Sequence, residues 1–304
     1  MSSMHEIKSL GLRSDLMIAS HKSVIEDCRD YILVKSAHNP DDCWGNFLLF
    51  KHPPAMLDAQ LCNARSWEYF FHREFADQPN VGHVAFTWDS PEGIPGDSEE
   101  FLALGFHLNE SRVFTASEIY PPVYGNQEIR ISEINRVDQW RSVLDLLMLV
   151  RDPIHDEKAY RRYLERKVEH YRALAMKKAG AWFGAFVGEH LVGTLGMFTG
   201  EGLGRFQHVV THPAYRRRGV CSTLMYEIGS LALTLDDVDQ LVVVAPAHDD
   251  ARRIYHSLGF KHSETLFSLE KSSSITDDDM SITQRMSTAQ TAPITQVTPT
   301  FSSI

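Results

Sequence analysis

Several patterns that would assign this chain to a familiar class are scarce or missing. Its 304 residues contain four cysteines, Cys28, Cys43, Cys62 and Cys221, with no Cys-x-x-Cys pair among them. This usage excludes a disulfide framework and a cysteine zinc site, and it favours a reduced, cytoplasmic setting. The fifteen histidines include no His-Glu-x-x-His spacing, so we predict no metal site.

Long apolar runs and basic clusters are also missing. No segment approaches the length needed to span a membrane, and the start of the chain has no apolar stretch typical of a signal peptide. The formal net charge is −10, which argues against nucleic acid and membrane surfaces as partners. A glycine series at Gly200, Gly202 and Gly204 lacks the Gly-x-Gly-x-x-Gly spacing of a dinucleotide loop and precedes a predicted strand, so we interpret it as a hairpin turn.

The most informative stretch runs from residue 206 to residue 260. A strand is expected from about Arg205 to His212, because Pro213 cannot continue a ladder. An Arg/Gly-rich turn at 216–222 then leads into a helix, followed by an apolar strand at 241–245 and a helix that carries Tyr255. The first of these helices should present one apolar face to a core, with Val220, Leu224, Ile228, Leu231 and Leu235 at helical spacing.

The start of that helix is suited to binding phosphate. The first turn of a helix has backbone N–H groups without internal partners and the positive end of the dipole, and a glycine allows close approach. Neighbouring arginines add charge-assisted contacts. A run of three arginines is also compatible with a solvated turn, or with a small nucleic-acid-binding module.

These residues resemble the GCN5-related N-acetyltransferase (GNAT) family, whose acetyl-CoA loop reads Arg/Gln-x-x-Gly-x-Gly/Ala. The pattern here is Arg216-x-x-Gly219-x-Cys221, and Cys221 departs from the family's Gly or Ala. The strand before the loop, the helix and strand after it, and Leu258-Gly259-Phe260 all follow the family's order. The resemblance covers about Ile129 to Lys271.

The resemblance implies an acetyl-CoA site and one catalytic residue. Tyr255 would protonate the departing CoA thiolate. Cofactor contacts would come from the pantetheine-pairing strand, from the pyrophosphate turn and from a histidine where the family has Asn: Val209, Val210, Thr211, Arg217, Arg218, Gly219, Val220, Cys221, Ser222 and His248. The reaction implied is direct attack of an amine on the thioester, without a covalent acetyl-enzyme.

No general base can be named from the sequence. Val243 stands where some members of the family project a Glu, and strand alternation turns His208 to the face opposite Arg205 and Gln207. The resemblance points to Asp152–Tyr163 for contacts with the acceptor, a small-molecule or peptide amine. A helix at Val137–Val150, a second at His155–Lys178 and a hairpin of strands at 181–187 and 191–198 complete this half.

The N-terminal half repeats part of this pattern. Residues 104–114 mirror residues 258–268 at an offset of 154, with Leu, Gly, Phe and Glu in register. Strands at 31–36, 45–50 and 81–88 and a helix at 56–75 give the element order of the later half. Phe101 falls at the position of Tyr255, and no Arg/Gln-x-x-Gly loop precedes the predicted helix. We therefore expect an acetyltransferase-like scaffold without the cofactor chemistry. Three roles are open for it, namely acceptor recognition, docking of a basic partner and, as the default, cover of an exposed sheet surface.

Together these patterns predict an α/β (α+β) protein with two tandem GNAT-like domains, each a mixed, mostly antiparallel sheet flanked by helices. The domains would span 1–125 and 126–271, with a linker near 121–126 and a disordered tail at 272–304. Nine basic and 18 acidic residues make the first domain acidic, whereas 20 basic and 19 acidic residues leave the second nearly neutral, which suits anionic CoA better.

The leading hypothesis is an acetyl-CoA-dependent N-acetyltransferase. The alternative is a non-enzymatic acyl-CoA-binding or sensing protein, suggested by the missing base and by Cys221. The oligomeric state and the acceptor cannot be read from the sequence.

Overall fold

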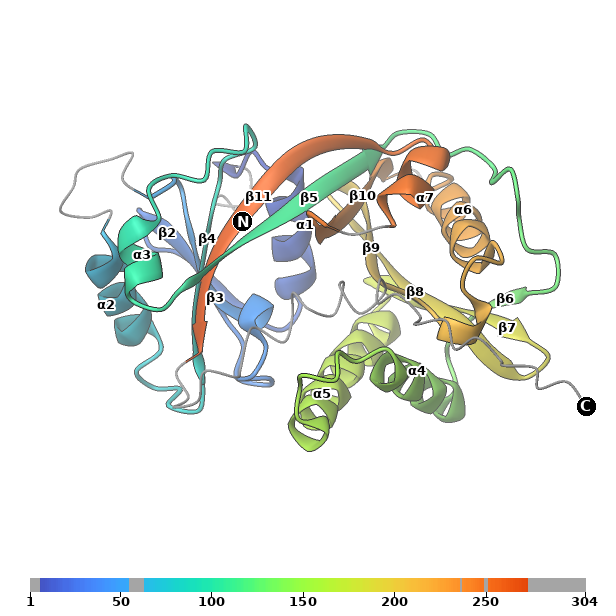
Figure 1. The fold of residues 1–304 in the computed structure, drawn as a ribbon, viewed down its shortest axis with the longest axis horizontal. Helices are drawn as coiled ribbons and strands as arrows, with labels where there is room; N and C mark the ends of the chain where they lie inside the picture. The colour runs from blue at the N-terminus through green and yellow to red at the C-terminus, as the bar shows by residue number, and fades with distance from the viewer. Residues whose placement is uncertain (1–5, 55–62, 236, 249–250, 273–304) are drawn as a thin grey trace, which may run out of the picture.

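A computed structural model describes residues 6–54, 63–235, 237–248 and 251–272. These residues form one continuous eleven-stranded sheet with helices packed against it (Figure 1). The predicted tail, apart from Ser272, lies outside the described residues, as does the first part of the helix predicted at 56–75.

The elements of the N-terminal half are α1 (Leu10–Ala19), β1 (Val24–Asp27), β2 (Tyr31–Lys35), β3 (Asn46–Phe50), α2 (Ala64–Glu74), β4 (His83–Trp88), α3 (Glu99–Ala103) and β5 (His107–Ala116). Those of the C-terminal half are β6 (Arg130–Glu133), α4 (Val137–Leu149), α5 (Glu157–Met176), β7 (Gly180–Val187), β8 (His190–Gly200), β9 (Gly202–Thr211), α6 (Val220–Ala232), β10 (Val238–Pro246), α7 (Arg252–Ser257) and β11 (Lys261–Ser272). The hairpin interpretation of the glycine series is confirmed, because β8 and β9 pair antiparallel with only Glu201 between them.

The internal repeat is visible in the order of elements. β3-α2-β4-α3-β5 in the first half matches β9-α6-β10-α7-β11 in the second. The offset of 154 residues places the start of β5 at His107 against the start of β11 at Lys261. The two halves therefore share one supersecondary plan.

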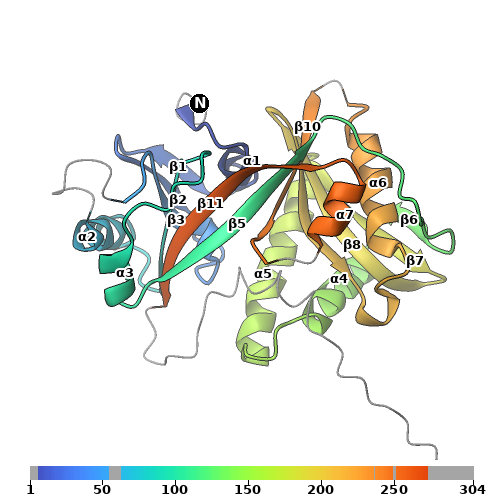
Figure 2. The ribbon, with the colours of Figure 1, turned by 45° about the horizontal axis from the view of Figure 1, so that its top comes forward.

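The two halves exchange their last strands. The sheet order is β1-β2-β3-β4-β11-β5-β10-β9-β8-β7-β6, so β11 lies between β4 and β5, and β5 lies between β11 and β10. Both views show these two long strands side by side, crossing from one half to the other (Figures 1 and 2). The sheet is therefore not divided at residue 125, because strands from both sides of this position belong to it.

The parallel strands differ between the halves. β3 and β4 remain paired to their ends, at Phe50 and Trp88, and Phe50 stacks on Trp67 of α2 with ring centroids 3.6 Å apart. Aromatic side chains thus fill the place between helix and sheet in the first half. Phe101, at the position of Tyr255, is part of this packing, with 1% of its surface exposed.

Some expectations from helical spacing were wrong. Leu231 and Leu235 are 53% and 44% exposed. Leu231 lies in the last turn of α6, and Leu235 lies beyond the end of this helix at Ala232. Five of these helices and strands, α1, β1, α3 and the two long strands β5 and β11, were not predicted. Of these, α1 matters most, since it packs at the junction of the two halves in a core cluster with residues of β3, β10 and β11.

Candidate active site

The two parallel strands β9 and β10 separate part-way along their length. They pair from Val238 and Gly202 up to Val242 and Arg205, and β9 then continues to Thr211 while β10 continues to Pro246. A cleft of about 180 Å³ opens at this point. Its wall includes Val209 and Val210 of β9 and Tyr255 of α7, so the structure brings together these three residues predicted from the sequence.

A β-bulge at His208 shapes the β9 side of the cleft. The register between β8 and β9 shifts between the pairs Gly196–Gln207 and Thr194–Val210, and His208 has a positive φ of 44°. A bulge places consecutive residues on one face. The expectation that His208 faces away from Gln207 is therefore wrong: both residues line the cleft, and the His208 ring contacts that of Tyr171 on α5.

Tyr255 is held by aromatic packing. Only 3% of its surface is exposed, and its ring lies 5.3 Å from that of Phe114 and 6.4 Å from that of Phe260, centroid to centroid. Phe114 belongs to β5, so the exchanged strand of the N-terminal half fixes the orientation of this phenol.

The arginine turn lies beside the end of β9. Arg216 donates from Nε to the carbonyl oxygen of Thr211, 3.4 Å away, and Arg217 and Arg218 are exposed. Gly219 is the N-cap of α6, with a φ of 75°, a conformation that strongly favours glycine. The positively charged turn is thus on the surface at a helix start, as the phosphate-binding interpretation requires.

The linker between the halves packs against this turn. Asn126 donates from Nδ2 to the Arg218 carbonyl oxygen at 2.7 Å, and its backbone N–H donates to Thr223 Oγ1 at 2.8 Å. A Cβ at Gly219 would lie 2.4 Å from the Tyr124 carbonyl oxygen. Glycine is therefore required here for two reasons, its backbone conformation and the approach of the linker.

Other predicted cofactor residues lie apart from the cleft. Thr211 and the turn residues 217–222 are not part of its lining, and neither is His248, which is exposed just beyond β10. Thr211 and the turn at 217–222 follow the β9 wall closely in the sequence. Of Asp152–Tyr163, the lining includes Tyr160.

Two ion pairs join the halves beside the cleft, whose lining includes Asp15, Arg205 and Lys167. Arg205 of β9 pairs with Asp15 of α1 at 3.0 Å, and Lys167 of α5 pairs with Asp42, which precedes the short 3₁₀ helix at Cys43–Gly45, at 2.5 Å. Burial raises the pKa of Asp15, and Arg205 opposes that effect. Burial would lower the pKa of Lys167, but Asp42 raises it well above its usual value.

The neutral groups of the cleft remain uncharged at physiological pH. Burial, with a smaller contribution from Lys167, lowers the pKa of His208 to about 3. Burial raises the pKa of Tyr171 to about 12. The cleft therefore contains a neutral imidazole, that of His208, and a protonated phenol, that of Tyr171, beside two ion pairs.

Sequence reasoning missed the contribution of the N-terminal half to this site. Asp15, Trp44 and Ser111 all line the cleft. The spacing of Leu12, Leu16 and Ala19, with Ser9 as an N-cap, could have indicated α1. Nothing local could have placed Asp15 opposite Arg205, because their contact spans 190 residues.

Two classes of feature are missing from the part of the chain that the structure describes. Within it, no group of three or more His, Cys, Asp and Glu side chains is arranged to hold a metal ion. Among those same residues, no helix combines the length and apolar character needed to cross a membrane.

Comparisons with known proteins agree with this geometry. A sequence model of the acetyltransferase (GNAT) family matches residues 140–260. No curated protein matches the chain in sequence.

Solved structures share the overall fold. A conserved protein of unknown function from Staphylococcus epidermidis has a TM-score of 0.63 at 15% identity, over 83% of this chain and 94% of its own. A GCN5-related N-acetyltransferase from Kribbella flavida has a TM-score of 0.60 at 11% identity, over 87% and 96%. A tandem GNAT protein from the clavulanic acid biosynthesis pathway has a TM-score of 0.51 at 11% identity, over 87% and 89%.

Residues 140–260 therefore match the acetyltransferase (GNAT) family, and the chain shares its fold with a tandem GNAT protein.

Proposed function

We propose that this protein is an N-acetyltransferase that transfers the acetyl group of acetyl-CoA to an amine, a small molecule or a peptide. The observation that carries the proposal is the cleft between β9 and β10, which opens where the strands stop pairing and has Tyr255 in its wall. The family match over the same residues supports this assignment.

The residues fit acetyl-CoA as a co-substrate. The pantetheine arm would lie along Val209, Val210 and Thr211, where β9 has parted from β10. The diphosphate would bind the start of α6, with Gly219 at the N-cap and Arg217 and Arg218 exposed beside it. Val220, Cys221 and Ser222 would contribute first-turn amides, and exposed His248 would reach the cofactor from the loop after β10.

The reaction follows from the groups in the cleft. The amine lone pair forms a bond to the thioester carbonyl carbon, and main-chain N–H groups of β9 stabilise the resulting oxyanion. The carbon–sulfur bond then breaks, and the Tyr255 phenol donates its proton to the leaving thiolate. The acetylated nitrogen releases one proton to solvent, which restores the phenol, so no net proton is consumed within the site.

Titration with acetyl-CoA followed by a turnover assay tests the proposal. Binding should be saturable, and the free thiol of CoA should appear when a panel of amines, amino acids and peptides is added. Saturable binding without turnover on any amine would favour the acyl-CoA-binding or sensing alternative. The absence of binding would leave the arginine turn without its proposed ligand.

A pair of glycine variants localises the binding. Gly219→Ala forces a Cβ against the Tyr124 carbonyl oxygen, whereas Gly105→Ala, at a φ of 85°, meets nothing within 4 Å. Gly105→Ala should lose about 1 kcal/mol of stability from backbone strain, and Gly219→Ala should lose more because its Cβ also meets the Tyr124 carbonyl oxygen. Only Gly219→Ala should weaken acetyl-CoA binding, by roughly tenfold, and equal affinities for the two variants would contradict the assignment of the turn.

A further inference from the structure

A second cavity of about 60 Å³ adjoins the cleft, between the N-terminal half and α5. The two cavities have five lining residues in common: Asp15, Trp44, Lys167, Tyr171 and Gln207. The smaller one extends from these residues towards the segment 36–45 of the N-terminal half. A volume of this size holds a small head group or a few water molecules.

Two acceptor oxygens on residues of this wall are buried without a hydrogen-bond partner: Asn39 Oδ1 and Asp42 Oδ1. Asn39 and Asp42 are only 6% and 7% exposed. The other polar atoms of both side chains are engaged, since Asn39 Nδ2 donates to the Tyr163 carbonyl oxygen at 3.4 Å and Asp42 Oδ2 accepts from Lys167 Nζ at 2.5 Å. A buried acceptor that lacks a donor is destabilising, so this pair of oxygens favours a ligand with N–H groups.

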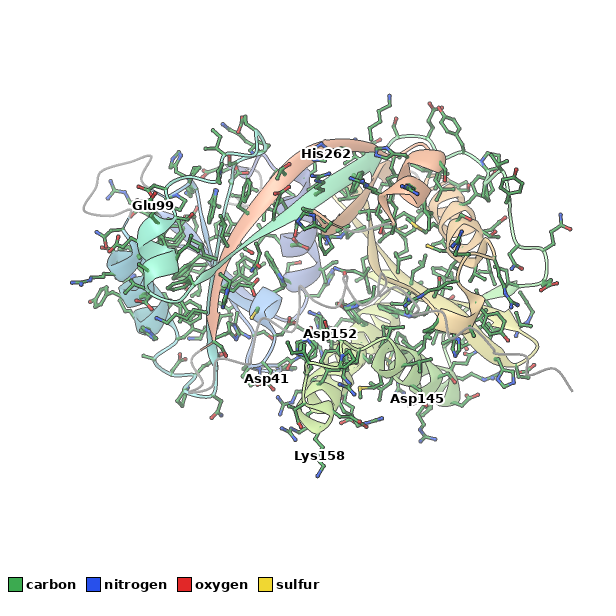
Figure 3. All side chains as sticks on the ribbon, in the orientation of Figure 1. Asp41, Glu99, Asp145, Asp152, Lys158 and His262 are labelled. Carbon is green, nitrogen blue, oxygen red and sulfur yellow. The ribbon has the colours of Figure 1, made fainter. Side chains whose placement is uncertain are left out.

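The acidic and basic side chains around the cavity are paired with one another or with near neighbours. Lys167 is already paired with Asp42, and Arg166 is paired with Asp41 at 2.9 Å. Figure 3 shows Asp41 on the side of the N-terminal half that faces α5. Burial and then Lys167 lower the pKa of His170 to about 4, so this imidazole adds no positive charge at neutral pH.

The N-terminal half as a whole attracts cations. With 18 acidic and nine basic residues in positions 1–125, its net charge of −9 contrasts with the nearly neutral second half. A potential of this sign raises the local concentration of a cationic substrate and speeds its association.

We infer that the acceptor is a short diamine or polyamine, and that its second, non-reacting ammonium group binds Asn39 Oδ1 and Asp42 Oδ1. The inference rests on the proposed acetyltransferase function, whose site it extends. One neutral amine of the acceptor attacks the thioester in the cleft, and the ammonium at the other end keeps its protons and donates them as hydrogen bonds. The N-terminal half then recognises the acceptor, in addition to covering the sheet.

Steady-state kinetics test the inference. Diamines with three to five carbons should be acetylated at least about tenfold more efficiently, in kcat/KM, than the monoamines of equal length. Asn39→Leu should reduce this ratio about tenfold, because it removes one acceptor. Asn39→Asp, which keeps an acceptor oxygen, should retain the preference, and so should Asn135→Leu at an exposed position outside the cavity.

Two measurements separate the inference from the function on which it rests. Equal kcat/KM for diamines and matched monoamines would overturn the inference while leaving the acetyltransferase function intact. Calorimetric titration of CoA-loaded protein with 1,4-diaminobutane needs no turnover. Binding that Asn39→Leu weakens would support the cavity even if no acetyl transfer occurred, whereas no binding, or binding unaffected by Asn39→Leu, would overturn it.

Discussion

Tyr255 and His208 show how single residues of this site depend on their surroundings. The sequence places both near the cleft, but their chemistry is fixed by neighbours from other elements. Phe114 of β5 packs against the Tyr255 ring, and Tyr171 of α5 contacts the His208 ring. The β-bulge that places His208 in the cleft wall was not predicted by any local sequence motif.

Replacing Tyr255 by Phe should lower kcat by about 100-fold with an accepted amine, because general-acid catalysis typically contributes that much or more. Affinity for acetyl-CoA should change little, since the ring remains. Tyr226→Phe is the matched control, because Tyr226 packs at the edge of the same core cluster and is not part of the cleft lining. Equal rates for Tyr255→Phe and Tyr226→Phe would show that Tyr255 is not the acid.

Stability should fall as the pH drops below about 6.5. The pKa of His208 is lowered to about 3 in the folded chain, against about 6.5 when unfolded. The unfolded state therefore binds more protons between these values, and the stabilisation present above pH 6.5 is progressively lost towards pH 3, by up to about 1.4 kcal/mol per pH unit.

His208→Asn should make this decline shallower, because the variant has no imidazole to protonate on unfolding. Urea unfolding of the wild type and the variant at several pH values between 7.5 and 5 measures both slopes. Identical slopes would mean that His208 is accessible to protons in the folded chain.

At the scale of elements, α1 is anchored by a strand from the far end of the chain. Glu264 of β11 accepts from Ser9 Oγ at 2.6 Å, from the Leu10 N–H at 2.8 Å and from the Gly11 N–H at 3.2 Å. A carboxylate at a helix N-terminus satisfies its orphan donors and interacts favourably with its dipole. The same helix carries Asp15 into the cleft, so Glu264 positions a residue of the site.

Glu264→Ala should lower the free energy of unfolding by about 2–3 kcal/mol, because three buried donors lose a charged acceptor. Denaturant titration measures the change. Glu189→Ala, at an exposed position in the β7–β8 turn, should stay within about 0.5 kcal/mol of the wild type. If Glu264→Ala lost no more stability than the Glu189→Ala control, α1 would be held by its apolar contacts alone.

Most elements of the C-terminal half were predictable from local pattern. The helices α4, α5 and α6, the β7–β8 hairpin and strands β9 and β10 all lie close to their predicted ranges, because alternation, helical spacing, Pro213 and the glycine turns act over a few residues. α1 was missed, since ten residues give a weak periodic signal and its burial comes from the opposite end of the chain.

At the scale of the whole molecule, the exchanged strands join the halves into one sheet. β5 pairs with β10 from Leu241–Ala116 to Pro246–Ser111, and β11 pairs with β4 from Ser268–Thr87 to Ser272–His83. A fragment of residues 126–271 would expose the edge of β10 and would leave β11 without either neighbour. Unpaired edges of this length favour aggregation.

Expressed alone, residues 126–271 should therefore be insoluble or lack a cooperative unfolding transition. Co-expression with residues 1–125 should yield a soluble complex, since the two pieces supply each other's missing strands. Size-exclusion chromatography and thermal unfolding followed by circular dichroism distinguish these states. A monomeric, cooperatively folded 126–271 fragment would show that the second half is an independent folding unit.

The sequence by itself determined the acetyltransferase-like second half, the repeat, the positive turn at a helix start and the position of Tyr255, because each depends on residues close together in the chain. Only the tertiary structure decided which half-chains share strands, that His208 enters the cleft, and that Asp15, Asn39 and Asp42 of the N-terminal half stand beside it. The strand exchange and the placement of Asp15, Asn39 and Asp42 depend on contacts across 100 or more residues, and the position of His208 depends on a bulge between two neighbouring strands. All are selected by the packing of the whole sheet rather than by any local preference.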